Sequence, residues 1–285
     1  MPKCEGEAGA IIPETPTNRF AAGSGACSQW RCMLVFIVPL QSPLASSNWA
    51  LVSALCERTL RSICAQTAGP FRVFLVCNQA PAMTFSHPDL TIIEDDFAIP
   101  ERTTAARMFD KHEKLKRGMI AAGHLAPCHV MFADADDCVH RGLAEWCAKN
   151  PGHPGWYIVD GYIHTAGSPW LYRRRDFDLL CGTAAVVHCE PADFPREMTD
   201  PKPDFFMIDC GHFEFRNPER AGGRKLDPLP FPGAVYVTAT GENDSGMSLR
   251  EWRGKKMLLK KLINSRLLTK RLRADYGLYE VETHR

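Results

Sequence analysis

The sequence has no apolar run long enough to cross a membrane. Its longest uninterrupted apolar segment, Cys32–Leu40, falls far short of the roughly 20 residues that a spanning helix requires. The first residues show no positively charged stretch followed by an apolar core, so no secretory signal is expected. We therefore do not expect an integral membrane protein.

Clustered cysteines and a strong net charge are also missing. The twelve cysteines are scattered singly, with no CxxC pair and no Cys/His cluster of zinc-finger spacing. We expect reduced thiols and a cytoplasmic location. A formal net charge of +1 creates no overall field that would attract a polyanion, so no nucleic-acid partner is expected.

What is present is typical of a globular protein. The 285 residues are 45% hydrophobic and 24% charged, enough for one large core. Residues 1–31 are rich in Gly, Ala, Pro and Ser without apolar periodicity, and we expect a disordered leader there. A folded domain is expected over 32–240, followed by a basic helical tail over 241–285.

Strand and helix patterns alternate along the domain. Apolar runs typical of buried strands occupy 32–38, 71–77, 90–93 and 128–133, and later 156–159, 184–188 and 234–238. Helical spacing occurs over 49–66, with Ser47 or Asn48 as N-cap, and over 101–124. This alternation predicts an α/β fold with a mostly parallel central sheet and flanking helices.

Polar side chains follow four of the predicted strands. They are Gln41, Asn78, the pair Asp95–Asp96 and the run Asp134–Asp137. Ligands of parallel α/β sheets bind beyond the carboxyl ends of the strands. The pattern therefore predicts one cleft that these residues line.

The run Asp134-Ala135-Asp136-Asp137 carries the most chemical information. Three carboxylates in four residues repel one another unless a cation or water screens them. One of Asp134 and Asp136 can bind a hard cation while the other reaches a ribose or a metal-bound water. Mg²⁺ or Mn²⁺, shared with substrate phosphates, suits such a site.

Three alternatives compete for the same segment. An EF-hand would use Glu145 at position 12, but Val139 stands where that loop needs Gly, and a strand precedes the motif. A phosphatase with an Asp-x-Asp nucleophile would need Thr or Val where Asp137 stands. A solvated acidic turn would need no metal at all.

The order of these motifs resembles the family 2 glycosyltransferases of GT-A fold. The resemblance rests on Val38-Pro39, Leu60 to Gln66, Val73 to Asn78, Lys114 to Gly118 and Phe132 to Asp137. It covers roughly residues 32–145 and weakens beyond them. Many relatives have Asp where this chain has Asn78, a departure at a position that would contact the nucleoside.

The resemblance implies a GT-A fold and transfer of a sugar from a nucleotide-diphosphate donor to an acceptor hydroxyl. Asp134 and Asp136 would hold Mn²⁺ or Mg²⁺ on the diphosphate. The implied donor-binding residues are Pro39, Gln41, Asn78, Asp96, Lys114, Asp134, Ala135 and Asp136. The acceptor, whether a glycan, a lipid-linked sugar or a small molecule, is not implied. The basic helix around Lys114 has a second interpretation as a solvated face.

A transferase that inverts configuration also needs a general base. Relatives place an acidic residue at the start of a later helix, and Asp209 fits that description. His212 is a rival for the base or a further metal ligand. The acceptor would meet Asp160 to Tyr162 and Cys181 to Thr183, with Trp156 and Trp170 as stacking aromatics.

The tail is strongly basic between Arg250 and Arg273. Its apolar positions recur at helical spacing, namely Leu258, Leu259, Leu262, Ile263 and Leu267. Such a helix would either lie on the anionic inner face of a membrane or pack its apolar stripe on the domain. We favour packing.

Two other functional classes remain open. A nucleotidyltransferase would use a similar sheet and metal, but a Gly-rich, basic loop should follow its first strand, and the segment from Gln41 to Ser47 lacks one. A non-catalytic protein that binds nucleotide sugars would keep the cleft without a working base. Only an activity assay separates that case from an enzyme.

Overall fold

The computed structural model describes residues 33–200, 215–218, 223–240 and 263–281. The expected leader lies outside this part of the chain, and the described residues belong to one compact unit. Four α-helices are described: α1 (Trp49–Cys64), α2 (Thr104–Ala122), α3 (Leu143–Lys149) and α6 (Lys270–Tyr276). Among the described residues, no helix is both long and apolar enough to cross a bilayer.

A seven-stranded sheet, sheet A, forms the centre of the fold. Its order is β10 (Asp227–Pro228), β6 (Gly155–Tyr157), β9 (Ala185–Cys189), β4 (Cys128–Phe132), β1 (Leu34–Pro39), β2 (Phe71–Cys77) and β3 (Leu90–Glu94). The strands β3, β2, β1 and β4 run parallel, whereas β9 is antiparallel to both β4 and β6. The predicted α/β class is therefore correct, and sheet A is mixed, with its parallel part at β4, β1, β2 and β3.

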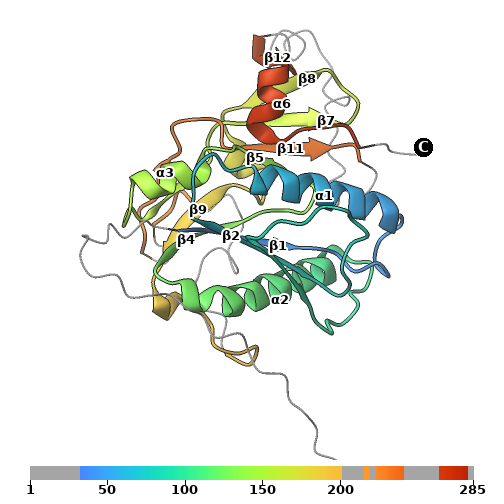
Figure 1. Cartoon of the computed structure of the whole chain (residues 1–285), viewed down its shortest axis with the longest axis vertical. Helices are drawn as coiled ribbons and strands as arrows, with labels where there is room; N and C mark the ends of the chain where they lie inside the picture. Colours follow the sequence, from blue (N-terminus) through green and yellow to red (C-terminus); the bar gives the residue numbers. More distant parts are fainter. Residues whose placement is uncertain (1–32, 201–214, 219–222, 241–262, 282–285) are drawn as a thin grey trace, which may run out of the picture. The chain divides into compact units, whose positions relative to one another are not determined.

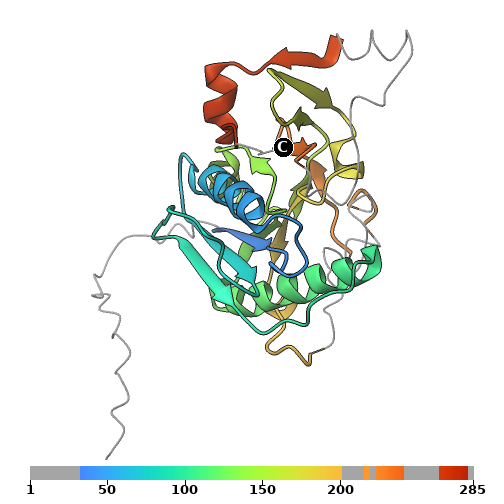
Figure 2. The same cartoon turned by 90° about the vertical axis from the view of Figure 1, so that its right-hand side faces the viewer.

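Strand β1 lies in the middle of the parallel part and all six of its residues are buried. That is why its sequence is a continuous apolar run rather than an alternating one. Helices α1 and α2 cover opposite faces of sheet A (Figures 1 and 2). Asn48 is the N-cap of α1, where its side chain accepts a hydrogen bond from Leu51 N at 3.1 Å.

A second sheet, sheet B, has the order β12 (Ser265–Leu267), β8 (Trp170–Arg174), β7 (Gly161–Thr165), β11 (Ala234–Thr238) and β5 (Cys138–Val139). Of these strands only β11 is expected from sequence. Its residues 234–238 are all buried, and β11 pairs with β5, the two residues that directly follow the carboxylate run. The edge strand β5 of sheet B therefore follows directly after the carboxylate run Asp134–Asp137.

The tail differs from the single basic helix that its periodicity predicts. Residues 241–262, with Leu258, Leu259 and Leu262, lie outside the described residues. Ser265–Leu267 form β12, antiparallel to β8, so a continuous helix through Leu267 is wrong. Thr269 caps a new helix, α6, by accepting from Leu272 N at 3.2 Å. Pairing with β8 satisfies backbone groups that a helix would satisfy internally.

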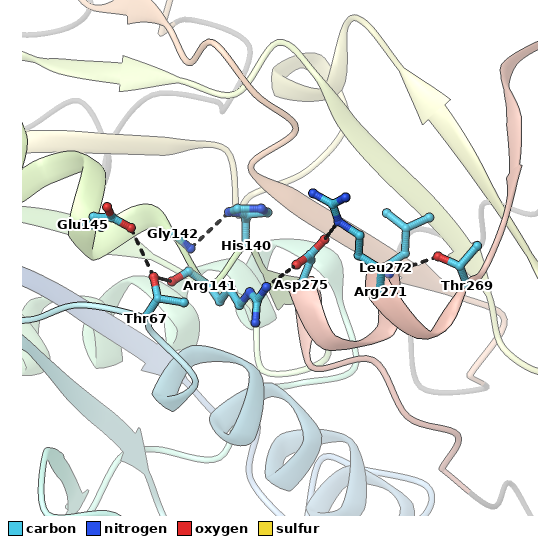
Figure 3. Close-up of polar contacts among 9 residues, drawn as sticks. All are labelled: Thr67, His140, Arg141, Gly142, Glu145, Thr269, Arg271, Leu272 and Asp275. Atoms are coloured by element: carbon cyan, nitrogen blue, oxygen red, sulfur yellow. Dashed lines mark hydrogen bonds and ion pairs between the residues drawn. The ribbon is translucent and has the colours of Figure 1, made fainter.

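Helix α6 packs on the domain, but it is not the helix that the apolar stripe predicts, and the two described stripe residues, Ile263 and Leu267, are 63% and 53% exposed. The hydroxyl of Ser62 in α1 donates to the carbonyl of Tyr276 at 2.7 Å. Asp275 lies between Arg141 and Arg271, at 2.9 and 3.7 Å (Figure 3). Gly277 ends the helix with a φ of 59°, the left-handed conformation that glycine adopts without strain. The described tail is thus an integral part of the folded unit.

None of the eight described cysteines is in a disulfide bond. Buried thiols such as Cys56 and Cys181 have pKa values raised by burial, so they stay protonated and act as small apolar side chains. This agrees with the expectation of reduced thiols.

A buried histidine makes the fold sensitive to acid. His129 in β4 is fully buried and its Nε2 lies 2.9 Å from the carbonyl of His153. Burial, together with the charges of His188 and His153, lowers the pKa of His129 from 6.5 to about 4. The unfolded chain binds this proton more readily, so stability is present above about pH 6.5 and is lost as the pH falls to about 4.

We expect the free energy of unfolding to drop by about 3 kcal/mol over that window from this residue alone. The variant His129→Gln keeps a hydrogen-bond donor but cannot titrate. Its free energy of unfolding, measured in urea at several pH values, should depend less on pH. Equal slopes for the parent and the variant would contradict the assignment.

Candidate functional site

A cavity of about 470 Å³ opens at the carboxyl ends of β1 and β4. Its walls are the end of β1, one face of α2, the carboxylate run and the segment 180–182. The charged residues that line it are Arg107, Asp110, Lys111, Lys114, Asp134 and Asp136. The remaining lining includes the predicted donor residues Pro39, Gln41 and Ala135. Side chains far apart in sequence thus meet at the predicted edge of the sheet.

Helix α2 supplies four of the charged groups because of their spacing. Asp110, Lys111 and Lys114 lie three, four and seven residues after Arg107, a spacing that places all four on one face of a helix. The opposite interpretation, a solvated basic face, is wrong for Lys114, which is completely buried. Lys111 is 28% exposed and borders the cavity.

The backbone of the carboxylate run is held by α1. The Thr59 hydroxyl lies 3.0 Å from the carbonyl of Ala135 and 2.7 Å from that of Asp137. Arg58 donates from Nη2 to the carbonyl of Asp136 at 2.8 Å. These contacts use main-chain carbonyls, and Asp134 and Asp136 both line the cavity.

Asp137 has a structural role that separates it from the other two carboxylates. It is fully buried and accepts hydrogen bonds from the Thr183 hydroxyl at 2.7 Å, Cys181 Sγ at 3.0 Å and the backbone N–H of Val237 at 3.2 Å. Burial and the charges of Asp136 and Asp134 raise its pKa well above the usual value. Asp137 therefore joins the carboxylate run to β11 and to the segment 181–183.

Asp134 is oriented from two sides. Its backbone N–H donates to the Thr183 hydroxyl at 2.9 Å, and its carboxylate forms an ion pair with Lys111. A Cβ on Gly182 would lie 2.8 Å from Asp134 Oδ2 and 3.2 Å from Lys111 Nζ, so only glycine leaves room for this pair. Burial lowers the pKa of Lys111, but the adjacent Asp134 carboxylate outweighs it and the pKa is raised.

Asp136 has the electrostatics of a cation ligand. Burial and the negative charge of Asp134 raise its pKa to about 6. A divalent cation between the two carboxylates would remove that repulsion. No group of three or more His, Cys, Asp or Glu suited to a metal occurs in the part of the chain that the structure describes. The two aspartates thus fit a Mg²⁺-type site that takes its other ligands from phosphates and water.

Lys114 and Asp110 form a buried ion pair in the cavity wall. Lys114 Nζ lies 2.7 Å from Asp110 Oδ2, and the side chains are only 1% and 8% exposed. The amine also lies 5.5 Å from the ring centre of Phe97. Burial lowers the pKa of Lys114 and raises that of Asp110, in each case against the effect of the partner. The charged forms of Lys114 and Asp110 are therefore each stabilised by the ion pair against the effect of burial.

Two predicted donor residues lie outside the cavity lining, namely Asn78 and Asp96. The Asn78 amide donates to the carbonyl of Phe97 at 2.7 Å, which holds the segment after β3 against the end of β2. The neighbour of Asp96, Asp95, forms an ion pair with Arg117, whose Nε lies 2.7 Å from Asp95 Oδ2. At the ends of β2 and β3, these polar side chains thus bind other residues of the chain.

The predicted base and third metal ligand cannot be placed. Asp209 and His212 both lie in 201–214, outside the described residues. Of the expected acceptor residues, Cys181 and Gly182 line the cavity. Asp160 instead forms a two-point ion pair with Arg173 at 2.9 and 2.6 Å.

The aromatics expected to stack on a sugar lie elsewhere. Trp156 is buried against the rings of His153 and His129, and Tyr162 packs on Tyr276. Trp170 lies at the outer edge of sheet B, half exposed. These contacts favour the commoner structural role of buried aromatics for Trp156 and Tyr162.

The EF-hand alternative does not fit the geometry. Glu145, which would be its twelfth ligand, lies in α3, where its carboxylate pairs with Lys149 at 2.5 Å and accepts from Thr67. The motif follows a strand and leads into β5 rather than into a loop between two helices.

Sequence reasoning missed three charged residues of the cavity, Arg107, Asp110 and Lys111. The signal was available, because they lie at helical spacing from Lys114, at seven, four and three residues before it. No protein-family model matches the chain, and no curated protein matches its sequence. Function therefore has to be inferred from the residues of the cavity.

Proposed function

We propose that the protein is a metal-dependent glycosyltransferase that moves a sugar from a nucleotide-diphosphate donor to an acceptor hydroxyl. The observation that carries the proposal is the cavity at the ends of β1 and β4, where Asp134 and Asp136 face the basic side of α2. The resemblance of residues 32–145 to family 2 glycosyltransferases, and with it a GT-A fold, supports the same conclusion.

The charges of the cavity suit a diphosphate that arrives with a divalent cation. Three cationic side chains, Arg107, Lys111 and Lys114, lie among three carboxylates in the lining. The ligand pair adds little net charge, since the cation offsets most of the phosphate charge. The diphosphate alone or the cation alone would leave the charges of the cavity unbalanced, and unbalanced charge in a low-dielectric site is costly.

In this proposal Asp134 and Asp136 hold Mn²⁺ or Mg²⁺, and Lys111 and Lys114 stabilise the leaving diphosphate. The cation, when bound, supplies positive charge where negative charge develops on the leaving oxygen. The bond from the anomeric carbon to the diphosphate oxygen breaks, and a bond to the acceptor oxygen forms. The acceptor proton passes to a general base of this chain.

A panel of nucleoside diphosphates and nucleotide sugars tests the proposal. With Mn²⁺ or Mg²⁺ present, at least one should raise the melting temperature, and the matching sugar donor should release its nucleoside diphosphate. Release of pyrophosphate would identify a nucleotidyltransferase instead. Stabilisation without turnover on any acceptor would identify a non-catalytic binding protein. Absence of any metal-dependent stabilisation would overturn the proposal.

The base is assigned from sequence alone. If Asp209 is the base, Asp209→Asn should retain donor binding while transfer falls by about two to four orders of magnitude. If His212 is a metal ligand, His212→Ala should first lose affinity for Mn²⁺ and nucleotide. This variant therefore separates a role as metal ligand from a role as general base. Transfer by Asp209→Asn at the parent rate would place the base elsewhere.

A further inference from the structure

The outer edge of sheet B exposes a group of large apolar side chains. Leu267 in β12 lies directly opposite Trp170 in β8, so the two side chains are neighbours on one face of the sheet. They are 53% and 51% exposed, and Ile263, just before β12, is 63% exposed. Three large apolar residues at one edge are more than scattered surface exposure predicts.

Exposed basic residues border the same edge. They are Arg266 in β12 and Lys270 and Arg271 at the start of α6. Arg271 is 90% exposed and only loosely paired with Asp275, which is more closely bound to Arg141. The other acidic residue of this segment, Glu280, is paired with Arg273. The edge therefore has an excess of positive charge.

The position in the sheet keeps this group accessible. Strand β12 is the last strand of sheet B, and among the described residues β8 is its only pairing partner. Arg266 and Leu267, as neighbours on a strand, point to opposite faces of the sheet, and both side chains are exposed. Figure 2 shows β12 running along that edge and leading into α6.

We propose that this edge surface, made of Trp170, Ile263, Leu267, Arg266, Lys270 and Arg271, binds the surface of an anionic lipid membrane. Tryptophan is favoured at the boundary between headgroups and acyl chains, where leucine and isoleucine insert. Arginine and lysine bind the phosphates of anionic headgroups. The contact is peripheral and goes beyond the proposed transfer activity, from which it is independent.

Sedimentation of the full chain with vesicles tests the proposal. We expect the protein to pellet with phosphatidylcholine vesicles that contain phosphatidylglycerol and to stay in solution with phosphatidylcholine alone. Binding should weaken as salt is added. The variant Arg266→Glu/Lys270→Glu/Arg271→Glu should lose binding by at least about tenfold, since each cation contributes separately near a charged surface. Trp170→Ser/Leu267→Ser should also lose it.

Matched controls carry the same kinds of change elsewhere on the surface. Lys149→Glu/Lys225→Glu reverses two exposed charges, and Ile92→Ser removes an exposed apolar side chain of β3. Both controls should pellet like the parent. Quenching of tryptophan fluorescence by brominated lipid should fall in Trp170→Phe, which keeps an apolar ring, while pelleting is retained.

Undiminished pelleting of either edge variant, or failure of the parent to pellet with anionic vesicles, would overturn the proposal. A parent that forms dimers without vesicles, and loses them in Trp170→Ser/Leu267→Ser, would assign the edge to a second copy of the chain instead. None of these measurements uses a nucleotide, so they succeed or fail separately from the proposed function.

Discussion

Replacing Lys114 by methionine is expected to lower the free energy of unfolding by about 3–5 kcal/mol, because removing one partner of a buried ion pair leaves the other charge uncompensated. The pair qualifies, since Lys114 and Asp110 are 1% and 8% exposed and 2.7 Å apart. Burial already raises the pKa of Asp110 from 3.8, and without Lys114 it should rise further. An acid with a raised pKa loses stability as the pH rises, so the loss should be greatest at neutral pH and shrink on acidification.

The double variant Lys114→Met/Asp110→Leu separates stability from binding. Two apolar side chains in place of a buried pair are often tolerated, so most of the free energy of unfolding should return. Donor binding should not return, because the cation proposed to meet the diphosphate is still missing. Urea unfolding and calorimetric titration with nucleoside diphosphate and Mn²⁺ measure the two effects. A single variant as stable as the parent, or a double variant with parental affinity, would contradict these roles.

The parallel part of sheet A was predictable because its strands are buried on both faces. Phe71–Cys77 has the bounds that its apolar run predicts, and α1 begins at the predicted cap Asn48. The end of α1 is less accurate. Gln66, expected inside the helix, instead accepts from Ala144 N at 2.9 Å and satisfies the start of α3.

Four of the five strands of sheet B were not predicted, and for two of them the reason is their length. β5 has two residues and β12 three, too few for a period of two to appear. The basic tail shows the same limit more sharply. Leu267 matches a helical spacing with Ile263, yet Ser265–Leu267 pair as a strand with Trp170–Tyr172 in the folded chain. Tertiary pairing of this kind is not encoded in local periodicity.

The candidate site was predicted at the carboxyl ends of the strands, but only in part. Gln41, Asp134 and Asp136 line the cavity, whereas Asn78 does not. Strand order indicates which ends meet, but it does not show that a carbonyl such as that of Phe97 already engages the Asn78 amide. Nor does composition separate Asp137 from its two neighbours. Their difference comes from hydrogen bonds that Asp137 accepts from Cys181, Thr183 and Val237, which lie 44, 46 and 100 residues later in the chain.

Asp136, unlike Asp137, is a proposed metal ligand, and its replacement is expected to have the second large effect. Replacing it by alanine should abolish Mn²⁺-dependent binding of the nucleoside diphosphate, since one of two proposed metal ligands is lost. The fold should survive, because Arg58 holds this position through the backbone carbonyl of residue 136, which the substitution leaves in place. The melting temperature without ligands should stay equal or rise, because the repulsion from Asp134 that raises the pKa of Asp136 disappears.

Asp137→Ala, one residue away, is the matched control. It is expected to lower the stability of the fold, whereas Asp136→Ala is expected to abolish metal-dependent binding. It removes a carboxylate that accepts from Thr183, Cys181 and Val237, so buried donors lose their partner. Each such loss costs about 1–3 kcal/mol, and the variant should melt well below the parent. Thermal shift with and without nucleoside diphosphate and Mn²⁺ gives both readouts for both variants. If Asp136→Ala binds the nucleotide with unchanged metal dependence, the two aspartates are not the metal site, and the acidic segment is a structural turn fixed by Asp137.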